Sequence, residues 1–153
     1  MLDKIQFTQD GYKNLEKELA ELQDNKQPQA VQRLHKARSM GDLAENSEYS
    51  AAKEELAFVQ GRIREIEELM KRAEIIEPQT TDGITIGTEV VVEKDGKIEI
   101  FSIVGEFEAD PLAKKLSATS PIGKSLLGKK EGDTVVVEVP AGKQKYKILK
   151  IKK

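Results

Sequence analysis

The fold is decided by residues 49–73, which read YSAAKEELAFVQGRIREIEELMKRA. Apolar side chains recur in this stretch at alternating spacings of three and four residues, at Tyr49, Ala52, Leu56, Val59, Ile63, Ile66, Met70 and Ala73. A 3.5-residue repeat of this kind places the apolar side chains along one narrow seam of a helix, as in a coiled coil. We therefore predict one long helix that needs a partner along this seam.

Residues 12–37 supply that partner. Their apolar repeat runs through Tyr12, Leu15, Leu19 and Leu22 and resumes at Ala30, Leu34 and Ala37. Pro28 lies between the two runs; because a proline inside a helix removes a hydrogen bond and clashes with the preceding turn, we expect a kink or a register slip there. Thr8 or Asp10 is expected to cap the start of this helix. Two arms of about thirty residues predict an antiparallel hairpin roughly 45 Å long, at 1.5 Å per residue.

The composition agrees with a solvated stalk better than with one large core. Of the 153 residues 34% are charged and 5% are aromatic, and the chain contains no Trp and no Cys. The lack of cysteine excludes disulfides, thiolate metal sites and a Cys nucleophile, and one histidine cannot build a His-rich metal site. The N-terminal residues lack the apolar core of a signal peptide, and no run reaches membrane-spanning length, so we expect a cytoplasmic protein with no membrane partner.

After Pro78 the apolar pattern changes from helical to strand-like. Four runs rich in β-branched residues predict strands at 89–93, 98–104, 134–139 and 144–151. Ser120-Pro121 followed by residues 122–127 predicts a short capped helix. The aromatic side chains of this half are expected in its core, and they are Phe101, Phe107 and Tyr146.

The predicted fold class is therefore α+β with two domains. Residues 1–77 form an antiparallel coiled-coil hairpin with an acidic tip near residues 41–46, and residues 78–153 form a small β-rich domain.

Two carboxylates occupy the turn between the predicted arms, where residues 41–46 read GDLAEN. In one interpretation, Asp42 and Glu45 form a capping box that starts the second helix. In the other, both side chains point outward from the tip and share a Mg²⁺ ion with water and a partner macromolecule. Because Mg²⁺ requires six oxygen ligands, the two carboxylates cannot complete such a site alone. The spacing is compatible with both interpretations.

Basic residues without acidic neighbours lead into this turn. Residues 25–40 contain no Asp or Glu, and Lys53 is expected at a similar height on the opposing arm. A solvated helix face is one interpretation, but unpaired like charges on neighbouring turns repel. The other interpretation is a track of phosphate contacts for a nucleic acid, made by Arg33, Lys36, Arg38 and Lys53. The net charge of −2 adds no general attraction, so such contact requires this local patch. Tyr49 either packs in the seam or stacks on a base.

Residues 37–53, which read ARSMGDLAENSEYSAAK, strongly resemble the tip of the bacterial Gre transcript cleavage factors of GreA type. The resemblance continues through residues 60–63 (QGRI) and 120–128 (SPIGKSLLG), so it covers nearly the whole chain. It implies a coiled-coil hairpin followed by an FKBP-like domain that binds bacterial RNA polymerase. The hairpin would enter the secondary channel and stimulate the polymerase's own hydrolysis of backtracked RNA, so the chain itself would not be an enzyme.

The resemblance also implies roles for individual residues. Asp42 and Glu45 would be the catalytic tip carboxylates and would hold Mg²⁺ only together with the polymerase, so the free protein, expected as a monomer, would carry no cofactor. Arg38 and Lys53 fall in the family's basic region near the RNA 3′ segment, and Arg33 and Lys36 match less closely. The polymerase-binding residues would be Ser120, Pro121, Ile122 and Gly123.

Three other functions remain open. An inhibitory paralogue that binds the same channel would carry a differently charged tip. A peptidyl-prolyl isomerase would need an aromatic-lined proline pocket in the FKBP-like domain. A GreB-type factor would have a larger basic patch and a pI above the value of about 5.6 found for this chain.

Overall fold

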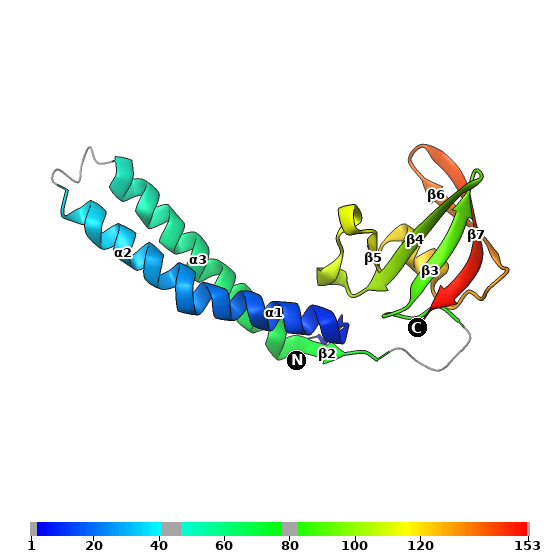
Figure 1. Cartoon of the computed structure of the whole chain (residues 1–153), viewed down its shortest axis with the longest axis horizontal. Coiled ribbons are helices and arrows are strands. Elements are labelled where there is room, and N and C mark those ends of the chain that lie inside the picture. The colour runs from blue at the N-terminus through cyan, green and yellow to red at the C-terminus, as the bar shows by residue number, and fades with distance from the viewer. Residues whose placement is uncertain (1–2, 41–46, 78–82, 153) are drawn as a thin grey trace. The chain divides into compact units, whose positions relative to one another are not determined.

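A computed structural model of the chain describes residues 3–40, 47–77 and 83–152. The chain divides into two compact units (Figure 1): residues 13–72 belong to a helical hairpin, and residues 1–12 group with residues 73–153 in a unit that contains a two-stranded and a five-stranded sheet. The predicted α+β class is confirmed. Our domain boundary at residue 77 stays a prediction, and residues 78–82 beside it lie outside the described part.

Three helical segments of the first arm lie against one long helix of the second (Figure 1). The first arm consists of α1 (Gln9–Glu21), the π-helical turn η1 (Leu22–Lys26) and α2 (Gln27–Arg38), and the second is α3 (Ser47–Arg72). The buried side chains between the arms are Leu15, Ala30, Ala37, Ala52, Val59, Ile63, Ile66 and Leu69. Because the α2 end of this seam is built of alanines, it buries little apolar area per turn.

Of the two irregularities predicted near Pro28, a kink or a register slip, the structure shows a register slip immediately before it, in η1. The backbone N–H of Gln27 donates to the carbonyl of Leu22, five residues earlier, which defines a π-helical turn. Pro28 then falls in the first turn of α2, directly after this wider turn. The inserted residue brings Ala30 back onto the seam.

At the other end of the hairpin the seam departs from the predicted repeat. Leu69 is buried in place of the predicted Met70, and the helix ends at Arg72, so that Ala73 begins the short strand β2 (Ala73–Ile75). Leu69 follows the buried Ile66 by three residues, where the predicted repeat has a step of four, so the buried face leaves the predicted seam before the helix ends.

The second unit contains a five-stranded sheet in the order β5-β4-β3-β7-β6. Its strands are β3 (Glu89–Lys94), β4 (Lys97–Val104), β5 (Lys115–Ser117), β6 (Thr134–Val139) and β7 (Gly142–Lys152). β4 and β5 pair in parallel and the other neighbours are antiparallel. Asp95 and Gly96 both have positive φ angles, as a tight two-residue hairpin between β3 and β4 requires.

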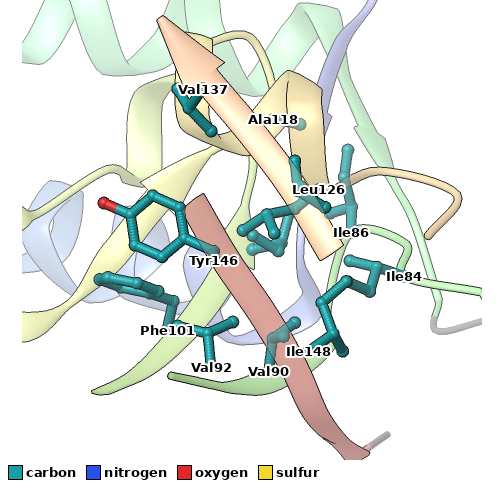
Figure 2. Close-up of a cluster of buried hydrophobic side chains, with 12 residues drawn as sticks. Ile84, Ile86, Val90, Val92, Phe101, Ala118, Leu126, Val137, Tyr146 and Ile148 are labelled. Carbon is teal, nitrogen blue, oxygen red and sulfur yellow. The ribbon is translucent and has the colours of Figure 1, made fainter. Parts of the chain in front are cut away.

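The core of this unit lies between the sheet and the short helix α4 (Pro121–Leu126), as Figure 2 shows. Leu126 of α4 packs with side chains from the strands and from the segment before β3, such as Val90, Ile148 and Ile84. Phe101 and Tyr146 meet edge to face there, with ring centroids 6.4 Å apart. Phe107 was predicted in this core as well, but it is 51% exposed.

Of the two predicted caps, Thr8 and Asp10, it is Thr8 that caps the start of α1. The Thr8 hydroxyl accepts a hydrogen bond from the Gly11 N–H at 3.0 Å. The carboxylate of Glu108 accepts from the Thr8 N–H at 2.7 Å and also from the Thr8 hydroxyl. In a capping box that carboxylate comes from the third helical position, which here is Gly11. A Cβ on Gly11 would lie 1.9 Å from the Glu108 carboxylate, so Glu108 occupies the place of the missing side chain.

Candidate functional site

The candidate site lies where α2 ends and α3 begins. The last turn of α2 carries His35, Lys36 and Arg38, and positive charge is favoured at a helix C-terminus. Asp42 and Glu45 lie outside the described residues, so their catalytic and metal-binding roles and the alternative capping box stay predictions. Within the described ranges, no group of three or more His, Asp or Glu side chains is placed to hold a metal ion.

Tyr49 joins the two arms at this end of the hairpin. The Nζ of Lys53, one helical turn further along α3, lies 5.4 Å from the centroid of the Tyr49 ring. The guanidinium carbon of Arg38, at the end of α2, lies 6.0 Å from the same centroid. Both distances fall within the range of a cation–π contact. The structure therefore brings together two of the four predicted phosphate contacts, and both of these side chains are exposed.

Arg33 has different surroundings. Its guanidinium donates to Glu48 from Nε at 2.7 Å and from Nη2 at 3.1 Å, and to Glu55 from Nη1 at 2.6 Å. The hydrogen bonds raise the pKa of Arg33 above its usual value and lower the pKa of Glu48 below 4.5. Arg33 thus links α2 to α3 beside the alanine seam. A phosphate would have to compete with these two carboxylates for the guanidinium of Arg33. Lys36, in contrast, is exposed, and no acidic partner for it is found among the described residues.

The lowered pKa of Glu48 predicts a pH dependence. The stabilisation from a carboxyl with a lowered pKa is present above its unfolded value of 4.5 and is lost as the pH falls through the folded value. We expect the melting temperature of the helical signal at 222 nm to fall less in Arg33→Gln than in wild type between neutral pH and about pH 3. Arg64→Gln, which removes an exposed arginine from α3, serves as the control. Equal pH dependence in all three proteins would show that Arg33 does not link the arms in solution.

The predicted polymerase-binding residues have clear structural roles within the β-rich unit. The Ser120 hydroxyl accepts from the Gly123 N–H at 3.1 Å, which caps α4, and donates to the Ser117 carbonyl at 2.7 Å. Ile122 packs against the core, and Gly123 is buried. Pro121, at the first position of α4, is exposed. Polymerase binding by these residues stays a prediction, and Pro121 presents the most surface for it.

The sequence reasoning missed the acidic side of the Arg33 linkage. Glu48 and Glu55 are seven residues apart, so they lie two turns apart on the same face of α3. That spacing, set against the acid-free stretch on the opposing arm, was the signal that could have indicated the pairing.

Comparison with known proteins identifies the class of this protein. Residues 5–75 match a family model described as "Transcription elongation factor, N-terminal". Residues 79–153 match one described as "Transcription elongation factor, GreA/GreB, C-term". Together these matches define a transcription elongation factor, and the chain belongs to the GreA/GreB family.

Curated relatives of this chain are named "Transcription elongation factor GreA". The one from Thermoanaerobacter pseudethanolicus is 46% identical over 157 aligned positions, which cover 100% of both chains. The one from Acidiphilium cryptum is 43% identical and covers 99% of both. Among solved structures, GreA factor homolog 1 (Gfh1) of Thermus thermophilus is 29% identical, covers 98% of this chain and 99% of its own, and gives a TM-score of 0.46. The identity and coverage of the curated relatives show that the chain is of GreA type. In the part of the chain that the structure describes, every helix is too short or too polar to span a membrane.

Proposed function

We propose that this chain binds bacterial RNA polymerase through its β-rich unit and inserts the hairpin into the secondary channel. There it stimulates the polymerase's own endonucleolytic cleavage of backtracked nascent RNA and so rescues arrested complexes. The observation that carries the proposal is the match of both parts of the chain, residues 5–75 and 79–153, to the GreA/GreB family models. The chain would act as a monomer and would not itself be a nuclease.

Within this proposal, the tip carboxylates of Asp42 and Glu45 hold a Mg²⁺ ion that is shared with the polymerase. Two carboxylates offer at most about four oxygens, fewer than the six that Mg²⁺ requires, so the donor set fits a shared ion only. When bound, the metal stabilises charge on the attacking and leaving oxygens of a phosphodiester. The two carboxylates also orient the attacking water, and Arg38 and Lys53 hold phosphates of the RNA 3′ segment.

The exposed side chains beside the tip support this assignment. Arg38 and Lys53 come from opposite arms and meet at one ring. Among the described residues, neither has a carboxylate partner, so both charges remain available to phosphates. The isomerase alternative gains no support, because Phe101 and Tyr146 are buried against each other and so do not line an open pocket.

The proposal is tested with stalled, backtracked elongation complexes that carry RNA labelled at its 3′ end. Addition of the protein should release short labelled fragments, and the same RNA without polymerase should stay intact. An inhibitory paralogue would instead slow the polymerase's intrinsic cleavage. Fragment release at the rate of polymerase alone would reject the proposed function.

A further inference from the structure

The basic residues near the tip fall into two kinds according to what each cation contacts. Arg33 is held by two carboxylates, which largely cancel its charge. Arg38 and Lys53 lie over the ring of Tyr49, at 6.0 Å and 5.4 Å. An aromatic ring attracts a cation through its quadrupole and carries no net charge, so it orients the cation and leaves the positive charge in place.

The surroundings of Tyr49 explain why such a contact is needed. Arg38 and Lys53 are long, exposed side chains that repel each other and that lose conformational freedom when a ligand fixes them. Ala37 and Ala52, which form the seam at this level, are too small to restrain either one. Tyr49 is partly buried and belongs to α3, so its ring is a fixed surface between the two arms.

We propose that Tyr49 is a positioning residue for the cleavage reaction, whose ring holds Arg38 and Lys53 ready to receive phosphates of the RNA 3′ segment. This inference rests on the proposed function and adds a residue to it. The hydroxyl group takes no part in it, and the ring does not contact the reacting atoms.

Two substitutions separate the ring from the other properties of the side chain. Tyr49→Phe retains the ring, and Tyr49→Leu retains apolar bulk and helix propensity without a ring. At saturating protein, Tyr49→Leu loses two cation–π contacts and should cleave backtracked RNA about five- to thirtyfold more slowly than wild type. Tyr49→Phe keeps both contacts and should cleave at the wild-type rate. The concentration of each protein that half-saturates core polymerase without RNA should be the same in all three, because in the proposed function the β-rich unit makes the docking contact.

A double-mutant cycle distinguishes positioning from a general loss of structure. In a background that carries Arg38→Ala and Lys53→Ala, Tyr49→Leu should cause no further loss of rate, because the ring acts through these two cations. Additive losses would overturn the proposal and would indicate that Tyr49 acts independently, for example by stacking on a base. Equal losses in Tyr49→Phe and Tyr49→Leu, or no loss in either, would also overturn it.

A measurement on the free protein keeps this inference separate from the proposed function. In the NMR spectrum the ε-methylene protons of Lys53 should be shifted upfield by the ring in wild type and in Tyr49→Phe, and should return to random-coil values in Tyr49→Leu. Random-coil values in wild type would overturn the inference even if the protein stimulates cleavage. Failure of wild type to stimulate cleavage, with the shift present, would reject the proposed function and with it the role of Tyr49 in that reaction.

Discussion

Replacing Asp42 by Asn or Glu45 by Gln is expected to slow the release of 3′-labelled fragments from backtracked complexes by about 100- to 1000-fold. In the proposed mechanism each carboxylate stabilises charge at the reacting phosphodiester, and such contributions amount to several kcal/mol, at about 1.4 kcal/mol per tenfold in rate. The concentration of protein needed to bind the polymerase should not change, because the proposed docking surface lies in the β-rich unit and not at the tip. Competition between each variant and wild type in the cleavage assay measures that binding.

The two substitutions also decide between the capping box and the metal-binding interpretation of the tip. Asn caps a helix about as well as Asp, and Gln can replace Glu in a capping box, so both variants preserve the cap and remove only the charge. The melting temperature of the hairpin should therefore equal that of wild type. Glu54→Gln, which neutralises an exposed carboxylate two turns into α3, should cleave normally and controls for net charge. Normal cleavage by Asp42→Asn and Glu45→Gln would leave the carboxylates with a capping role only.

The local features of this fold could be predicted from the sequence because each depends on neighbouring residues. The apolar repeat of residues 49–73 predicts α3. Pro28, where the repeat of the first arm breaks, predicts a kink or a register slip, and the π-helical turn η1 supplies the slip. The end of the seam could not be predicted in the same way. Leu69 is buried there although Met70 continues the strict repeat, so the repeat alone does not fix which side chain the fold covers.

Features that join distant parts of the chain were not predictable. Glu108 completes the capping box at Thr8, one hundred residues earlier, and nothing local to either residue indicates the pair. The strand β1 (Ile5–Phe7) is three residues long and pairs with β2, so neither has a strand-length pattern of its own. For the candidate site, the composition of residues 25–40 predicted a basic patch. The carboxylates that neutralise Arg33, and so distinguish it from the other cations of the patch, lie on the other arm.

The second large effect is expected from Gly123→Ala in the Ser-Pro-Ile-Gly motif. A Cβ at this buried position would lie 1.9 Å from the carbonyl oxygen of Ser117. That oxygen already accepts hydrogen bonds from the Ser120 N–H at 3.0 Å and from the Ser120 hydroxyl at 2.7 Å, so it cannot move without breaking the α4 cap. Overpacking against backbone is expected to lower the free energy of unfolding by about 3 kcal/mol. Amide hydrogen exchange in β3 and β7 reports this loss within the β-rich unit.

Gly61→Ala provides the matched control, because it makes the same chemical change where nothing opposes it. Gly61 lies within α3, and a Cβ there would meet no atom within 4 Å. Alanine is the better helix former, so this variant should stabilise the hairpin by about 0.5–1 kcal/mol, measured by urea unfolding at 222 nm. The two Gly→Ala changes should therefore change the free energy of unfolding in opposite directions.

If Gly123→Ala is as stable as wild type, then glycine is not required for packing α4 against Ser117, and its place in the motif would have to be explained by contact with the polymerase. If Gly123→Ala is destabilised, a loss of polymerase binding in that variant would be explained by unfolding. Docking would then be tested at the exposed Pro121, where a substitution need not unfold the unit.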